Sequence, residues 1–146
     1  MNDRFNLSRF VDAQQGLVAT VERELAAGAK RAHWMWFFFP QLVGLGRSEM
    51  ARRYAIASLD EARAYVAHPL LGPRLVECVR LANASPARCA QELFGEPDVV
   101  KFHSCLTLFA RAAPEAVIFS QSLKLFFGGV RDAATDAILR EMEMRP

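Results

Sequence analysis

Apolar residues recur through most of this chain at intervals of three and four, and proline, glycine and helix-capping residues interrupt the pattern at short intervals. This spacing gathers apolar side chains on one face of an α-helix, whereas a half-buried strand would alternate every second residue. The interruptions divide the chain into roughly eight segments. The sequence therefore predicts a mainly α-helical fold, a compact array of about eight helices.

Capping residues predict several helix boundaries. Asn6 is placed to cap a first helix that ends near Gln15, and Gly28 is placed for the left-handed residue that ends the next helix. Asp132 is expected to cap the last helix. The best strand candidate is the segment from Phe37 to Phe39, so the predicted fold leaves room for one short strand pair beside the helices.

The middle of the chain carries the clearest helix signals. Ser58 and Glu61 form a capping box, in which each side chain can accept a hydrogen bond from a main-chain amide of the other, and this predicts a helix over 59–67. Asp98 is expected to cap a long helix that ends near Ala112 and has a strongly apolar inner face. This helix is expected to be the central one.

Length and composition favour one globular domain over residues 1–146. Apolar residues make up 52% of the chain and charged residues 23%, which excludes the low hydrophobicity of a disordered protein. The formal net charge is only +2, and basic and acidic residues are interleaved. A balance this weak does not favour nucleic acid or an anionic membrane as a partner.

The chain carries no recognisable export signal, because its N-terminus lacks an apolar run beside a basic stretch. Its three cysteines, Cys78, Cys89 and Cys105, are an odd number without close spacing and are expected to be buried, reduced thiols. The most apolar stretch, 34–45, is too short to span a bilayer. We therefore expect a cytoplasmic protein.

The segment from His33 to Gln41 holds both tryptophans and three phenylalanines. Aromatic side chains of this density can fill a core, line a pocket that stacks on rings, or form an exposed docking surface for a partner. For the three phenylalanines the core interpretation is favoured. For Trp34 and Trp36 the core and the pocket are weighed equally.

Two of the three histidines are candidates for chemistry. His33 and His68 stand at segment boundaries, where functional side chains gather, and imidazole can act as acid or base near neutral pH. His103 lies inside a helix and is expected to be structural. The histidine separations match no zinc or iron pattern, so no metal and no cofactor are predicted.

Further polar candidates lie on a loop and on the long helix. Gly44 to Ser48 is a glycine-rich loop before a helix, where Arg47 could face an anion, although a simple Ser48 cap is the favoured interpretation. Lys101 and Ser104 share a polar face of the long helix with Thr107; this face is expected to meet either water or a ligand, and the solvated face is the favoured interpretation. The sequence contains no serine nucleophile-elbow motif, no activated cysteine and no pair of carboxylates that would indicate a hydrolase.

Several short motifs occur together in one order along the chain. They are Phe5-Asn6-Leu7, Arg9-Phe10-Val11, His33-Trp34-Met35-Trp36-Phe37, Phe39-Pro40-Gln41-Leu42, Gly44-Leu45-Gly46, His68-Pro69, Leu71-Gly72, Phe94-Gly95, Asp98, Lys101, Ser104, Thr107-Leu108-Phe109, Asp132 and Thr135. On these motifs the chain resembles a mainly bacterial family catalogued as domain of unknown function 1810, over about residues 5–139. Val99 and Cys105 depart from the family pattern, which has an acidic residue and a serine there.

The resemblance implies a small, mostly α-helical single domain and brings no established activity, cofactor or catalytic residue. Members of the family often carry the label calpastatin, which implies calpain inhibition. Inhibitors of that kind are long, disordered and repetitive, whereas this chain is short, apolar and helically patterned. We therefore reject calpain inhibition.

The leading functional hypothesis is a pocket for a small anionic ligand, nucleotide-like or phosphorylated. Aromatic rings would stack on the ligand and cationic groups would bind its charge. The expected pocket residues are His33, Trp34, Trp36, Gln41, Arg47, His68, Arg74, Lys101 and Ser104. Whether the protein is an enzyme is left open; transfer or hydrolysis would use His33 or His68. The alternative is a protein-interaction module that uses 34–39.

Overall fold

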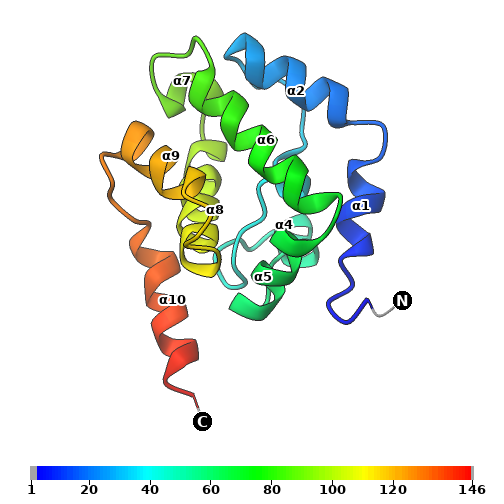
Figure 1. Cartoon of the computed structure of the whole chain (residues 1–146), viewed down its shortest axis with the longest axis vertical. Coiled ribbons are helices and arrows are strands. Elements are labelled where there is room, and N and C mark those ends of the chain that lie inside the picture. Colours follow the sequence, from blue (N-terminus) through cyan, green and yellow to red (C-terminus); the bar gives the residue numbers. More distant parts are fainter. Residues whose placement is uncertain (1–2, 146) are drawn as a thin grey trace.

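The computed structural model describes residues 3–145 and is mainly α-helical, as predicted (Figure 1). Within these residues the helices are α1 (Ser8–Gln14), α2 (Val18–Ala27), α3 (Met35–Phe38), α4 (Glu49–Arg53), α5 (Leu59–Ala67), α6 (Leu71–Ala84), α7 (Ala90–Phe94), α8 (Asp98–Ala112), α9 (Ile118–Phe127) and α10 (Ala133–Glu143). The only β-structure in the described part is an isolated bridge between Leu42 and Ile56.

Two long helices organise the packing. α6 packs against α2, α3, α5 and α9, while α8 packs against α5, α7, α9 and α10. Figure 1 shows α6 and α8 within the body of the molecule and α10 extending from it toward the C-terminus. The central place of α8 follows from its sequence, because apolar residues at helical spacing bury one face of it completely: Phe102, Cys105, Leu106 and Phe109.

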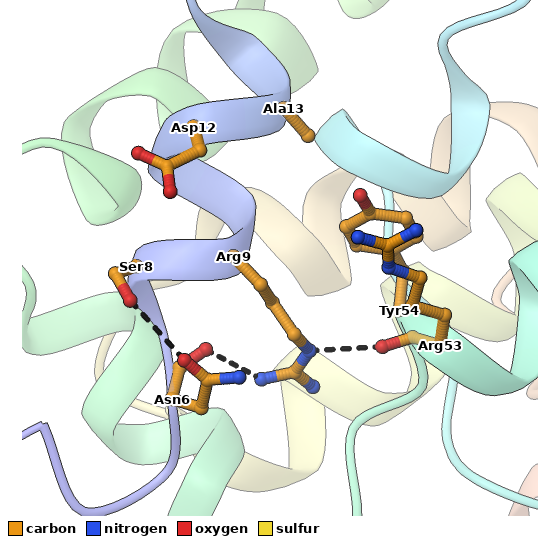
Figure 2. A pocket seen from close by; sticks show the side chains of 7 residues that line it. All are labelled: Asn6, Ser8, Arg9, Asp12, Ala13, Arg53 and Tyr54. Atoms are coloured by element: carbon orange, nitrogen blue, oxygen red, sulfur yellow. Dashed lines mark hydrogen bonds between the residues drawn. The ribbon is translucent and has the colours of Figure 1, made fainter.

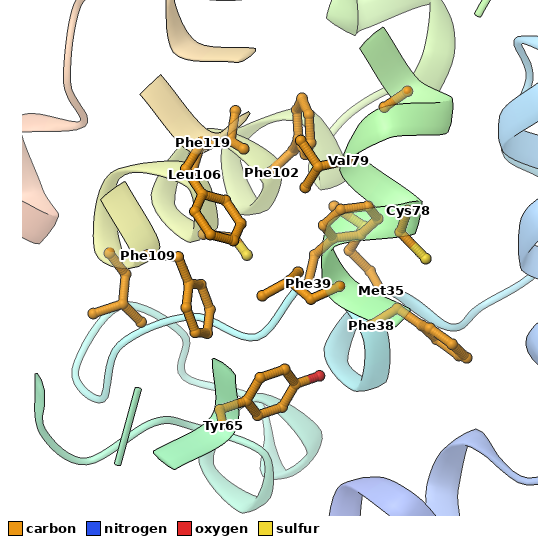
Figure 3. Packing of buried hydrophobic residues seen from close by; sticks show 14 of the residues in the cluster. Met35, Phe38, Phe39, Tyr65, Cys78, Val79, Phe102, Leu106, Phe109 and Phe119 are labelled. Atoms are coloured by element: carbon orange, nitrogen blue, oxygen red, sulfur yellow. The ribbon is translucent and has the colours of Figure 1, made fainter. Parts of the chain in front are cut away.

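Aromatic rings join the segment around α3 to α8. The ring of Phe39 meets that of Phe102 edge-on, with centroids 5.3 Å apart (Figure 3). The ring centroid of Phe94 lies 4.4 Å from that of Phe102. Tyr65 from α5 and Phe119 from α9 pack on Phe109. One of these pairs, Phe39 with Phe102, is edge-to-face, an arrangement that stabilises a core beyond its buried area, and the other three pairs are tilted.

The predicted strand at Phe37 to Phe39 is instead a single helical turn. In α3, Met35 and Phe38 are buried together with Phe39, which follows the helix, whereas Trp36 is only partly buried. Positions separated by three and four residues thus point inward, which a strand would not allow. The expectation of a core role is confirmed for the phenylalanines at 38 and 39.

The helix boundaries agree with the predictions where a cap binds within its own turn. Ser58 Oγ accepts a hydrogen bond from Glu61 N at 3.1 Å, and Asp132 Oδ2 accepts one from Thr135 N at 3.0 Å. Gly28 ends α2 with a φ of 80°, a left-handed value that glycine adopts without strain. The Glu61 carboxylate, however, accepts from Ala57 N instead of Ser58 N.

Two predicted caps are wrong. Asn6 has a φ of 54°, and the first turn is instead capped by Asp3, whose carboxylate accepts from Leu7 N at 2.6 Å. Asp98 lies inside the first turn of α8, after Pro97. Its carboxylate is therefore free to pair with lysines, as described below.

The cysteines are free thiols, and two of the three are buried as expected. Burial raises the pKa of Cys78 to about 12 and raises that of Cys105 well above its ordinary value. Cys89 is exposed, contrary to the prediction, because it precedes the short helix α7 at the surface. No helix among residues 3–145 has the length and apolar character needed to cross a membrane.

Candidate functional site

The segment that precedes α3 is anchored by one carboxylate. Glu24 Oε1 accepts hydrogen bonds from Arg31 N at 2.8 Å, Ala32 N at 3.1 Å and Trp34 Nε1 at 2.9 Å. Burial of Glu24 acts to raise its pKa, but the three N–H donors outweigh burial, so the pKa of this carboxyl is lowered. Trp34 is therefore a fully buried anchor whose polar tip already has a partner.

Beside this anchor lies a cleft of about 300 Å³, which we call the Trp36 cleft. The loop after α2, the helix α3, the end of α7 and the start of α8 form its walls. Three of the residues expected in a pocket, His33, Trp36 and Lys101, meet here. The complete lining is Lys30, Arg31, His33, Met35, Trp36, Phe94, Glu96, Pro97, Asp98 and Lys101.

One carboxylate in the cleft serves two ammonium groups. Asp98 Oδ2 lies 2.7 Å from Lys30 Nζ, and Asp98 Oδ1 lies 3.6 Å from Lys101 Nζ. The Lys30 side chain is only 5% exposed, while those of Asp98 and Lys101 are each 18% exposed. Charges this sheltered from water are weakly screened, so their balance governs what the cleft attracts.

Each of the two ammonium groups also lies over an indole ring. Lys30 Nζ is 4.9 Å from the ring centroid of Trp34, and Lys101 Nζ is 4.7 Å from that of Trp36. These are cation–π distances. Trp36 Nε1 is buried and has no hydrogen-bond partner among the described residues. An unpaired buried N–H is costly, and such groups mark places where the native interactions are incomplete.

Three residues expected in the pocket lie elsewhere. Arg47 is exposed, and the loop that holds it is organised by Ser48, which caps α4 by accepting from Ala51 N at 3.1 Å. Arg74 Nη1 donates to the side chain of Gln14 at 3.1 Å. Gln41 lies before the isolated bridge, where its carbonyl accepts from Ile56 N at 2.8 Å.

His68 and Ser104 also hold the scaffold together outside the Trp36 cleft. His68 Nδ1 accepts from Leu70 N at 3.1 Å and from Leu71 N at 3.3 Å, so this imidazole caps the start of α6. It borders a separate, mostly apolar hollow of about 610 Å³. Ser104 is buried, donates to Val100 O at 2.9 Å, and lies 3.4 Å from an Asp132 carboxylate oxygen.

A third hollow, of about 420 Å³, lies between α1 and the end of α4 (Figure 2). Its floor is the Arg9 guanidinium, which Figure 2 shows bridging toward Arg53. All five N–H donors of Arg9 are used, because they bind the carbonyls of Phe5, Asn6, Arg53 and Ala55 and the carboxylate of Glu61. Arg9 is thus a structural clamp with no donor left for a ligand.

Two charged residues of the Trp36 cleft, Lys30 and Asp98, were not predicted from the sequence as site residues. Lys30 is not among the pocket residues expected from the sequence, yet it is the most buried charge of the group, and Asp98 was expected to be a helix cap. The spacing of Asp98 and Lys101 on one helix face could have indicated their pairing. Nothing local to Lys30 reveals its partner, because the contact joins distant parts of the chain. Among the described residues, no three His, Cys, Asp or Glu side chains are grouped to hold a metal.

Comparison with known proteins gives one family and one solved structure. The profile of the family described as "Protein of unknown function (DUF1810)" matches residues 4–139. The crystal structure of the conserved hypothetical protein Rv1873 from Mycobacterium tuberculosis is similar, with 51% sequence identity and a TM-score of 0.92. The match covers 94% of this chain and 99% of that one. No curated protein matches the sequence.

Proposed function

The chain belongs to the DUF1810 family, and on that premise we propose that the Trp36 cleft binds a small anionic ligand, nucleotide-like or phosphorylated. The observation that carries the proposal is the shared carboxylate. A single Asp98 faces both Lys30 and Lys101, so it can neutralise only one of the two ammonium groups. The full lining carries three cations, Lys30, Arg31 and Lys101, and two carboxylates, Glu96 and Asp98, so one positive charge remains to attract an anion into the cleft.

The position of Lys101 favours a ligand that carries both charge and a flat group. Its ammonium lies on the face of Trp36, and its contact with Asp98 is longer than a hydrogen bond. A phosphate at Lys101 would gain a charge-assisted hydrogen bond, and a ring beside it could stack on the indole. The exposed Arg31 at the rim adds a second cation.

Any catalytic role in this cleft falls to His33. It is exposed and lines the cleft, whereas the Nδ1 of His68 is occupied as a helix cap in another hollow. An imidazole beside a bound phosphoryl group would serve as acid or base in transfer or hydrolysis. The proposed function is ligand binding. His33→Ala should keep this binding and remove any turnover that depends on the imidazole.

The alternative, a protein-interaction module built on residues 34–39, has less support. Trp34, Met35, Phe38 and Phe39 are each at most 1% exposed, so this segment offers no broad apolar surface. A docking patch needs contiguous exposed apolar area. The exposed apolar residues lie on other elements, such as Leu125 and Val130.

Thermal-shift measurements test the proposal. We expect at least one compound in a panel of nucleotides, phosphorylated metabolites and carboxylates to raise Tm, because a ligand that binds only the folded state stabilises it. At 100 times its Kd the stabilisation is about 2.7 kcal/mol, a rise of roughly 5 to 10 °C. Lys101→Gln and Trp36→Leu should each remove most of this rise.

The chain supplies a matched control in Lys124, an exposed lysine on α9 that does not line the cleft. Lys124→Gln makes the same charge change as Lys101→Gln and should leave the ligand-induced rise intact. The comparison uses the difference in Tm with and without ligand, so any loss of intrinsic stability cancels. A rise that survives both cleft substitutions, or no rise with any compound, would contradict the proposal.

A further inference from the structure

We propose that Asp98 is an internal counter-anion of the Trp36 cleft: it holds the two ammonium groups in place and weakens the binding of external anions in proportion to their charge. This inference rests on the proposed function, because it concerns the same cleft. Asp98 then sets both the affinity of the cleft for anions and its selectivity between anions of different charge.

The two lysines are held by Asp98 to different degrees. Lys30 makes the 2.7 Å contact, also donates to the carbonyl of Ala32, and lies against Trp34. Its ammonium is therefore fully partnered inside the protein. Lys101 has only the 3.6 Å contact and the face of Trp36, so an arriving anion meets Lys101 first.

The Asp98 carboxylate opposes that arriving anion directly. It lies within 3.6 Å of the Lys101 ammonium, so a ligand bound at Lys101 feels an attraction and a nearby repulsion at once. Both act on the ligand in proportion to its charge. Removing the Asp98 charge should therefore change log Kd about twice as much for a dianion as for a monoanion.

Asp98→Asn keeps the shape of the side chain and removes its charge. The test uses two probes that share a ring, benzoate as a monoanion and phenyl phosphate, which is close to a dianion above pH 7. Titrations followed by calorimetry and tryptophan fluorescence should show about threefold tighter binding of benzoate and about tenfold tighter binding of phenyl phosphate in this variant.

The matched control is Asp60→Asn. Asp60 and Asp98 are both acidic residues in the first turn of a helix, so the two substitutions make the same change in net charge and in the interaction with a helix N-terminus. Asp60 borders a different hollow, beside Leu139 and Met142. The Asp60→Asn variant should keep the Kd values of benzoate and phenyl phosphate within twofold of those of the wild type.

A second variant covers the case in which Asp98→Asn does not fold. Lys30→Gln leaves Asp98 to Lys101 alone, so both probes should bind more weakly, about threefold for benzoate and about tenfold for phenyl phosphate. Equal effects on the two probes in either variant, or an Asp60→Asn effect as large as that of Asp98→Asn, would overturn the inference.

The outcomes also separate this inference from the proposed function. If the wild type binds the probes, Lys101→Gln abolishes binding, and Asp98→Asn changes nothing, then the cleft binds anions and Asp98 is not a counter-anion. If neither the wild type nor Asp98→Asn binds either probe, this inference fails, and the thermal-shift panel still decides the proposed function.

Discussion

Gly72 shows at the scale of one residue how closely α6 approaches α5. A Cβ added at Gly72 would overlap the main-chain carbonyl oxygen of Val66, and backbone cannot move aside as a flexible side chain can. In the sequence, Gly72 stands out only as part of the Leu71-Gly72 motif. Its steric reason is visible only when the neighbouring helix is in place.

Gly72→Ala should therefore destabilise the protein strongly, by about 3 kcal/mol or more, because an overpacked backbone contact forces the two helices apart. Urea unfolding followed by circular dichroism measures the change. Gly16→Ala is the control, since Gly16 has a φ of 80° but no atom within 4 Å of the added Cβ. It should cost only about 1 kcal/mol. Equal losses for the two variants would argue against a steric cause.

The loop between α2 and α3 shows at the scale of an element how one side chain organises a segment. Glu24 on α2 binds two main-chain amides and the Trp34 indole, so it sets the course of the chain into the Trp36 cleft. The lowered pKa of Glu24 means that its charged form is favoured by folding. Stability from this group is present above its unfolded pKa and is lost as pH falls through the folded pKa.

Glu24→Gln should remove that acid-dependent part of the stability. At pH 7 we expect a loss of about 1 to 2 kcal/mol, because a neutral amide oxygen accepts hydrogen bonds more weakly than a carboxylate. The loss should shrink as pH falls from about 4.5, the ordinary pKa at which the unfolded wild type takes up a proton, through the lower pKa of the folded protein. Guanidinium unfolding at pH 7 and pH 3 tests this. A loss of the same size at both pH values would show that Glu24 acts through packing alone.

Helix caps were predictable where the contact is local. Ser58, Asp132 and Gly28 act within their own turns, so their neighbours in sequence are enough to identify them. Asn6 failed as a cap because its backbone adopts a φ of 54°, and Asp3 takes its place. The aromatic segment failed as a strand because its burial pattern is set by α8, which lies far away in sequence.

At the scale of the whole molecule, the core is sealed around two of the three thiols. Cys78 and Cys105 are buried among the side chains of α6 and α8, and burial raises the pKa of both thiols. Thiolate, and not thiol, is the reactive form. The core should therefore protect these two cysteines from aqueous reagents, while Cys89 at the surface stays accessible.

Titration with an aromatic disulfide reagent at pH 8 checks this packing. One thiol of the native protein should react quickly with the reagent, and Cys89→Ser should abolish this fast reaction. After unfolding in guanidinium all three thiols of the wild type should react. A second fast thiol in the native state would mean that the core opens readily, in conflict with the burial of Cys78 and Cys105.

The amino-acid sequence by itself determined the helical fold class, most helix positions and the aromatic identity of the segment beside the cleft. Helical periodicity and caps depend on residues within about four positions of one another, and those neighbours are written in the sequence. Only the tertiary structure decided which charges meet. Lys30, Asp98 and Lys101 come together because the loop after α2 binds α7, through Lys30 N and Leu93 O, and α7 packs against α8. The same tertiary structure places Arg47, Arg74 and His68 away from the cleft.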